Sequence, residues 1–172
     1  WIVKHRNILS LLVGLLLALP GAARAADPEV AALDMALLAM FYDQKELVVT
    51  PTRTAKPITQ VAENIVVITA EEIRDMHARS LAEVLNRVTG IFVRFQGQDY
   101  GSMAEIVVQG APTEQVLLLV DDIPWNPLSD GIARTSTVPV HTIERIEIIK
   151  GPASSAWGPA LGGVINVITK SG

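Results

Sequence analysis

The sequence predicts an α+β fold: a small mixed β-sheet with two short helices and long loops. Three observations lead to this prediction. Short apolar runs rich in Val and Ile recur after Asn64, as strands do. Two helix-start signals follow the first of these runs in close succession. Long polar loops then separate the later runs, so strands and helices do not alternate regularly.

The first 25 residues have the layout of a secretory signal peptide. Lys4, His5 and Arg6 form a basic start, and a 12-residue apolar run from Ile8 to Leu19 follows. Ala23-Arg24-Ala25 supplies the small residues of a cleavage site. A buried core helix and a membrane anchor are the alternatives, but a membrane span needs about 20 apolar residues. We therefore expect cleavage after Ala25 and export of the rest.

Composition excludes several function classes for the exported part. The signal peptide holds three of the 14 basic residues and no acidic one, which leaves 11 basic against 18 acidic residues. A formal charge of −7 on these 147 residues argues against nucleic-acid binding. The chain has no cysteine, which excludes disulfides, thiolate zinc sites and thiol catalysis.

The segment 26–45 is an N-terminal extension with helical spacing of apolar residues. This spacing predicts a short helix. The helix either docks on another surface or packs into the domain core, and the spacing is compatible with both. The apolar positions are Val30, Leu33, Leu37, Leu38 and Phe41.

Residues 46–60 predict an extended, exposed segment ahead of the compact domain. The run from Leu47 to Thr50 is β-prone, while Pro51 and Pro57 prevent a long strand or helix. An ordinary edge strand of the core is the alternative for this run.

The compact domain, 61–172, begins with a strand and two capped helices. A strand over 65–68 precedes Thr69, which forms a capping box with Glu72 and starts a helix that we expect to reach about Ala78. A second box, Ser80 with Glu83, starts a helix that we expect Gly90 to stop.

Five further strands and three connections complete the expected domain. The strands are predicted over 91–95, 105–109, 116–120, 142–149 and 164–169, and the connections over 96–104, 110–114 and 124–137.

No catalytic motif stands out in this framework. The loop GPASSAWGPALGG, 151–163, follows a strand but lacks the spacing of a phosphate-binding loop, and Ser154 and Ser155 are not in a nucleophile elbow. His77 and His141 have no ligand-spaced neighbours. Asp121-Asp122 suits a turn better than a cation site. We therefore expect neither an enzyme nor a cofactor.

Four segments together resemble the plug domain of TonB-dependent outer-membrane receptors, the siderophore and cobalamin receptor type. ELVVTPTR resembles the TonB box of this family. SLAEVLNRVTGIFV resembles its helix-then-strand signature. The third and fourth segments resemble its central strand pair and its final stretch of strand, loop and strand. The four are 46–53, 80–93, the strand pair IVVQGAP (106–112) with VLLLVDDIPWN (116–126), and IERIEIIKGPASSAWGPALGGVINVITK (143–170).

The resemblance implies a gate inside a β-barrel of about 22 strands. The C-terminal domain of TonB would bind the TonB box by adding it to a sheet edge, a mode that an extended β-prone segment suits. The expected TonB-binding residues are Glu46, Leu47, Val48, Val49, Thr50 and Pro51.

The resemblance also implies contacts with barrel and ligand. Gln109, Glu144, Glu147 and Lys150 are the candidates for fixing the plug in its barrel, but Gln109 stands where the family usually has Arg, which removes one ion pair. The family usually has Gly where this chain has Asp122. The expected contacts to a metal chelate (a siderophore or cobalamin) are Gln98, Tyr100, Trp125 and Asn126, with loop packing an equal alternative for Trp125.

Two functions follow from these observations. The first is the gate of an outer-membrane transporter for ferric siderophore or cobalamin-like substrates, seated in the barrel on its periplasmic side. The second is a stand-alone periplasmic plug that binds TonB or a metal chelate without transport.

Overall fold

A computed structural model describes residues 36–43, 45–97, 102–153, 157–158 and 160–170. The predicted signal peptide, most of the N-terminal extension, and the ligand candidates Gln98 and Tyr100 lie outside these residues. Residues 36–38 are helical, and the side chains of Leu37 and Phe41 are exposed. Within the described residues, no helix has the length and apolarity that a membrane span requires.

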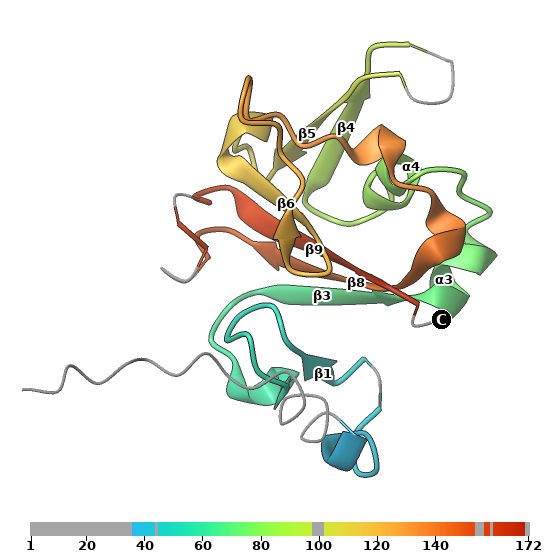
Figure 1. The fold of residues 1–172 in the computed structure, drawn as a ribbon, viewed down its shortest axis with the longest axis vertical. Coiled ribbons are helices and arrows are strands. Elements are labelled where there is room, and N and C mark those ends of the chain that lie inside the picture. The colour runs from blue at the N-terminus through green and yellow to red at the C-terminus, as the bar shows by residue number, and fades with distance from the viewer. Residues whose placement is uncertain (1–35, 44, 98–101, 154–156, 159, 171–172) are drawn as a thin grey trace, which may run out of the picture.

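A mixed five-stranded sheet forms the centre of the molecule, as predicted (Figure 1). In spatial order the strands are β3 (Ile65–Thr69), β8 (Ile143–Lys150), β9 (Gly163–Thr169), β6 (Val116–Val120) and β7 (Ile123–Pro124). Neighbouring strands are antiparallel except for β9 and β6, which are parallel. The runs of Ile and Val in β8 and β9 are buried along most of their length, as in strands that are covered on both faces.

One face of the sheet carries the helices and a separate hairpin. The hairpin pairs β4 (Ile91–Phe95) with β5 (Ala104–Val108). The helix α4 (Leu81–Leu85) packs against this hairpin, and four of its five side chains are buried. Together these elements and the sheet enclose the larger of two hydrophobic clusters.

The two helices begin where their caps predict and end earlier. The capping box of α3 (Ala70–Asp75) is complete: Glu72 N donates to Thr69 Oγ1, and Thr69 N donates to the Glu72 carboxylate. Helix α3 stops before Ala78 because His77 adopts a left-handed φ of 51°. Ser80 caps α4, but Glu83 accepts from the Arg79 amide instead of closing a second box.

Gly90 lies beyond the helix that it was expected to stop. Helix α4 ends at Leu85, turns follow, and Gly90 with its φ of 86° instead leads into β4. Short 3₁₀ turns complete the chain: η1 (Ile58–Gln60), η2 (Thr113–Gln115), η3 (Thr135–Thr137) and η4 (Val140–Thr142).

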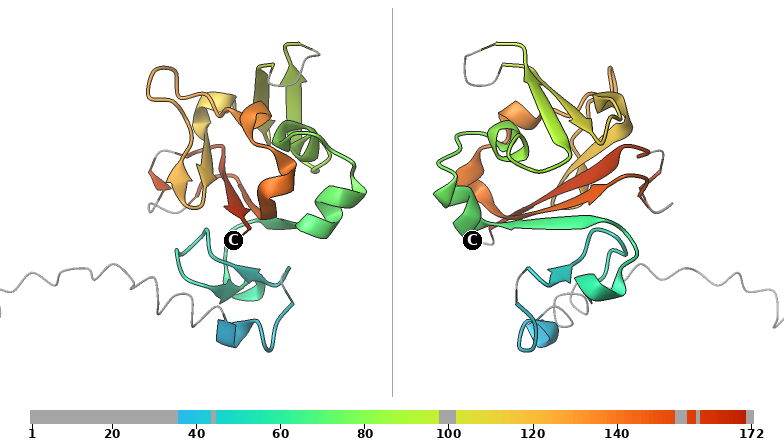
Figure 2. Two further views of the ribbon diagram at one scale, coloured as in Figure 1. Left: turned by 45° about the vertical axis from the view of Figure 1, so that its right-hand side comes forward. Right: turned by 180° about the vertical axis from the view of Figure 1, so that it is seen from behind.

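The other face of the sheet is covered by the N-terminal segment (Figure 2). There β1 (Leu47–Val48) pairs with β2 (Lys56–Pro57) in a two-stranded ribbon. A second hydrophobic cluster lies on this side and consists of Leu119, Ile149, Trp157, Ala160 and Val164. The molecule therefore has three layers, with the central sheet between the hairpin layer and the ribbon.

Candidate functional site

The segment expected to bind TonB is extended, but beyond Glu46 it is largely buried, so the expectation of an exposed segment was wrong for residues 47–51. Leu47 is 3% exposed and Val48 is 0% exposed. The prolines limit the strands to two residues each, as predicted, and the ribbon stays outside the central sheet. Its apolar side chains are nevertheless buried, since the ribbon lies against the face of the sheet. The backbone beyond Val48 needs hydrogen-bond partners that no strand supplies.

Glu147 supplies those partners from the middle of β8. Its Oε2 accepts hydrogen bonds from Val49 N at 2.9 Å, Thr50 N at 2.8 Å and Thr50 Oγ1 at 2.7 Å. Its Oε1 accepts from Arg145 Nε at 3.0 Å. A buried carboxylate is costly unless it is paired and hydrogen-bonded, and here both oxygens are satisfied. The side chain of Glu147 thus takes the place of a neighbouring strand.

Asn166 and Trp157 hold Thr50 from two further elements. Asn166 Nδ2 donates to Thr50 Oγ1 at 3.0 Å, and Trp157 Nε1 donates to the Thr50 carbonyl at 2.6 Å. The guanidinium of Arg53 lies 4.3 Å from the centroid of the Trp157 ring, within cation–π range. Every backbone and side-chain polar group of Thr50 therefore has a partner. We call Thr50, Glu147, Asn166 and Trp157 the Thr50 cluster.

Sequence reasoning missed the Thr50 cluster, although the chain contains one signal of it. A polar residue stands in the middle of each of two apolar runs, Glu147 in β8 and Asn166 in β9, and the two are directly paired in the sheet. A buried polar residue in a central strand requires a partner. The identity of that partner depends on a contact nearly 100 positions away in the chain.

The glycines that end the 151–163 loop allow close packing within the domain. A Cβ on Gly163 would lie 2.4 Å from the Ile149 carbonyl oxygen, and one on Gly162 would lie 2.8 Å from Ala111 Cβ. The backbone of the loop can approach β8 and the 111–116 segment because these side chains are absent.

Two of the candidates for barrel contact, Gln109 and Lys150, both lie close to Gly90. A Cβ on Gly90 would lie 3.7 Å from Gln109 Cγ and 3.8 Å from Lys150 Cδ, so both side chains pass over this glycine. Lys150 Nζ donates to the Thr89 carbonyl at 2.7 Å. Glu144 lies towards the other end of β8, 3.6 Å from Arg145 Nη1, and Glu147 is fully buried in the Thr50 cluster. The four candidates therefore do not form a single surface.

Asp121 and Asp122 form the turn between β6 and β7, as the sequence favoured. Both residues have positive φ, 49° and 64°, which a two-residue hairpin turn of this type requires. The carboxylate of Asp121 accepts from Thr169 N at 2.8 Å and from Thr169 Oγ1 at 2.7 Å. Among the described residues, no group of three or more His, Asp or Glu side chains is arranged to hold a metal ion.

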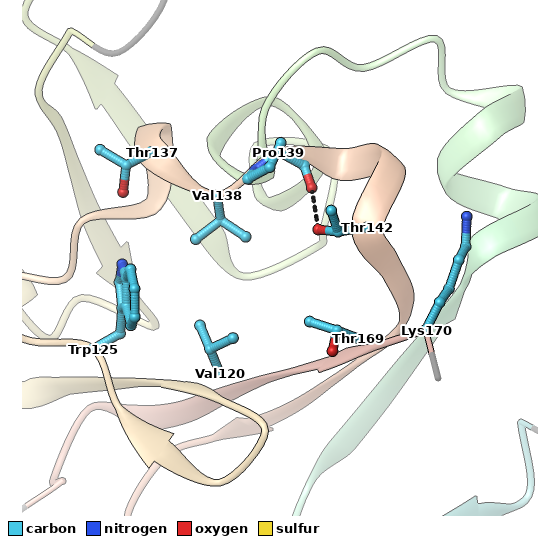
Figure 3. Close-up of a pocket in the computed structure, with 8 residues that line it drawn as sticks. All are labelled: Val120, Trp125, Thr137, Val138, Pro139, Thr142, Thr169 and Lys170. Carbon is cyan, nitrogen blue, oxygen red and sulfur yellow. Dashed lines mark hydrogen bonds between the residues drawn. The ribbon is translucent and has the colours of Figure 1, made fainter. Parts of the chain in front are cut away.

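The two described ligand candidates differ in their surroundings. The amide of Asn126 is committed within the chain: it donates to the carbonyls of Val116 and Gly131 and accepts from Leu118 N. Trp125 is 48% exposed and lines a largely apolar cavity of about 510 Å³ (Figure 3). Val120, Val138 and Thr169 face the same cavity, and Lys170 lies at its edge.

An ion pair ties the start of the segment to helix α3. Lys45 Nζ lies 2.8 Å from Glu72 Oε1. The hydrogen bond and charge of Glu72 raise the pKa of Lys45 above its ordinary value. Burial acts to raise the pKa of Glu72, but hydrogen bonds from Lys45 and Thr69 outweigh it and hold this pKa below its ordinary value.

Comparison with known proteins places these features in a family. Residues 57–164 match the family model of the TonB-dependent Receptor Plug Domain. The vitamin B12 transporter BtuB of Vibrio vulnificus is 42% identical over 126 residues, which are 73% of this chain and 20% of that protein. BtuB of Photobacterium profundum is 39% identical over 124 residues, 72% of this chain and 20% of that protein. The chain therefore spans about a fifth of these curated relatives.

Solved structures agree on the fold. The ferripyoverdine receptor of the outer membrane of Pseudomonas aeruginosa aligns with a TM-score of 0.62 at 23% identity, over 73% of this chain and 16% of that one. The siderophore receptor PirA of Acinetobacter baumannii aligns with a TM-score of 0.50 at 30% identity, over 62% of this chain and 17% of that one. These relatives are transporters and receptors and not enzymes, as the survey of motifs predicted. The chain belongs to the TonB-dependent receptor plug domain family.

Proposed function

We propose that this chain is the gate of a TonB-dependent outer-membrane transporter and sits on the periplasmic side within a barrel of about 22 strands. Identity of 42% to a vitamin B12 transporter over 126 residues carries the proposal. It favours a cobalamin-like substrate over a ferric siderophore, because the siderophore receptor PirA shares 30% identity over a smaller part of the chain. Trp125 is the ligand-contact candidate best supported among the described residues, as its ring is half exposed beside a cavity.

The segment from Glu46 to Pro51 is the site at which TonB would act. Residues 47 and 48 already have strand conformation, which is the form that strand addition to a partner sheet requires. Capture by the C-terminal domain of TonB would exchange the hydrogen bonds of Glu147 for those of a partner strand, because both use the amides of Val49 and Thr50. A pull on the captured segment would then act on β9 and on the 151–163 loop, because Asn166 and Trp157 hold Thr50 through bonds that do not use these amides.

A free peptide tests the assignment of the TonB box directly, because a peptide is not held against the sheet by the Thr50 cluster. Calorimetry would compare a peptide of residues 43–55 with its Val49→Pro variant, each titrated into a TonB C-terminal domain. We expect binding of the unmodified peptide and at least a tenfold loss for the variant, because proline removes a strand hydrogen bond and resists strand pairing. Equal binding of the two peptides would refute the TonB-box assignment.

A plug exchange tests the transport function. The plug of a BtuB transporter would be replaced by residues 46–170 of this chain, and uptake of radiolabelled cobalamin into whole cells would be measured. We expect uptake above that of the same chimera carrying Val49→Pro. Correctly inserted chimeras that take up no cobalamin would contradict the cobalamin assignment, and uptake of a ferric siderophore instead would reassign the substrate.

The stand-alone periplasmic plug is the second candidate. Gln109 favours it, because an uncharged side chain stands beside Lys150 where the family usually has Arg, and the barrel contact loses an ion pair. For such a plug, the 43–55 peptide would still bind TonB, whereas the chimera would fail to assemble with the plug inside the barrel. Restoration of seating by Gln109→Arg would instead support the gate.

A further inference from the structure

Asp122 occupies a backbone conformation that favours glycine. Its φ is 64°, in the left-handed region that costs an L-residue free energy and that glycine adopts without strain. The hairpin turn needs this conformation but does not need a side chain. The carboxylate of Asp122 must therefore be explained by what it contacts.

Its contact is the Thr50 cluster. Asn166 Nδ2 donates one hydrogen to Asp122 Oδ1 at 2.7 Å and the other to Thr50 Oγ1 at 3.0 Å. The Asp122 amide points back towards Asn166 Oδ1 at 3.4 Å. Asn166 is 1% exposed, so it has almost no access to water as a substitute partner.

Asp122 and Glu147, one at each end of this chain of hydrogen bonds, together fix the direction of the bonds between them. An ionised carboxylate can only accept, so it requires the NH₂ group of Asn166 on its side. The second hydrogen of this group then points to Thr50 Oγ1, which acts as the acceptor. The single hydroxyl hydrogen of Thr50 is left to donate to Glu147. If the side-chain amide of Asn166 were rotated by 180°, its oxygen would face the Asp122 carboxylate. Its NH₂ group would then no longer donate to Thr50.

We propose that Asp122 is a positioning residue which acts through Asn166 to hold Thr50, so that the residue at position 122 governs how readily the Glu46–Pro51 segment leaves the sheet. Only a side chain with a hydrogen-bond acceptor at position 122 can make this contact with Asn166, and glycine has no such acceptor. The effect on undocking is independent of TonB. Its consequence for capture by TonB rests on the proposed function.

Hydrogen exchange measured by NMR on the full chain tests the proposal. The readout is the exchange rate of the Val49 and Thr50 amides, compared with core amides such as Ile148 and Ile165. In Asp122→Gly we expect the two segment amides to exchange at least tenfold faster, since a hydrogen bond to a charged group is lost. Core amides should exchange at the same rate or more slowly, because glycine relieves the positive φ.

Asp122→Asn is the matched rescue variant. Asparagine tolerates the left-handed conformation and its side-chain oxygen can still accept from Asn166. We expect it to restore most of the protection at Val49 and Thr50. Unchanged segment exchange in Asp122→Gly would overturn the proposal. Equal acceleration of segment and core amides would also overturn it, because the role of Asp122 would then be general stability.

Titration with a TonB C-terminal domain separates the proposal from the proposed function. If undocking limits capture, Asp122→Gly binds more tightly by a factor similar to the rise in segment exchange. If no variant and no segment peptide binds, the proposed function fails while the exchange result still decides the role of Asp122. If all variants bind equally despite faster exchange, position 122 does not govern capture and that part of the proposal is overturned.

Discussion

The indole of Trp157 donates a hydrogen bond of 2.6 Å to the carbonyl of Thr50, 107 positions earlier in the chain. This bond joins the glycine-rich loop to the N-terminal segment across the second hydrophobic cluster. Both ends are buried, Trp157 at 7% and Thr50 at 0% exposure. The loop thus holds the segment in place with its one aromatic side chain.

Trp157→Phe tests the strength of this bond. Phenylalanine keeps an aromatic ring but leaves the Thr50 carbonyl without its donor, so we expect the free energy of unfolding to fall by about 1–3 kcal/mol. Urea denaturation monitored by far-UV circular dichroism measures the change. Trp125→Phe is the control, since this half-exposed indole should cost less than about 0.5 kcal/mol. Equal losses in both variants would contradict the role given to Trp157.

Glu147→Gln tests the buried carboxylate. Glutamine has nearly the same shape, but its NH₂ group faces a donor, whether it turns towards Arg145 or towards the Thr50 amide. We expect a loss of about 3 kcal/mol, as for other broken buried charge pairs. Glu144→Gln lies on the same strand, contacts the same arginine at 3.6 Å and is more exposed, so it should cost less than about 1 kcal/mol. A larger effect at 144 than at 147 would refute this account of the cluster.

The sequence predicted local structure better than it predicted the site. The strand over 116–120 was correct to the residue, because its apolar run is bounded by turn residues on both sides. Helix α3 was predicted too long because nothing in the pattern indicates the left-handed conformation of His77. The segment expected to bind TonB was predicted in the right conformation but in the wrong environment, because its burial depends on Glu147 and Trp157, about 100 positions away.

Gly163→Ala tests the close approach of the loop to the sheet. The new Cβ would lie 2.4 Å from the Ile149 carbonyl oxygen, and φ is 145°, so backbone must move. We expect a loss of about 3 kcal/mol or more in the free energy of unfolding, measured by urea denaturation. Gly131→Ala has a positive φ of 68° but no atom within 4 Å of its Cβ, so only the backbone strain of about 1 kcal/mol applies. Similar losses at both glycines would show that the contact with Ile149 is not tight.

The ion pair of Lys45 and Glu72 predicts a pH dependence whose direction is fixed by two pKa shifts. The pKa of Glu72 is lowered in the folded chain, so its contribution to stability is present above the ordinary value of 4.5 and is lost as the pH falls through the lowered value. The pKa of Lys45 is raised above 10.5, so its contribution is present below that value and is lost only as the pH rises through the raised one.

The contribution of the ion pair is measured as the difference in the free energy of unfolding between the unmodified chain and the variant Lys45→Met. We expect the unmodified chain to be more stable than the variant at neutral pH, by an amount that shrinks in strong salt because the pair is exposed. Urea denaturation from pH 7 downwards should show the two stabilities converge below pH 4.5, as protonation of Glu72 removes the attraction. A difference that stays constant from pH 7 to pH 3 would mean that the methylene stem of Lys45, and not its charge, holds the segment against α3.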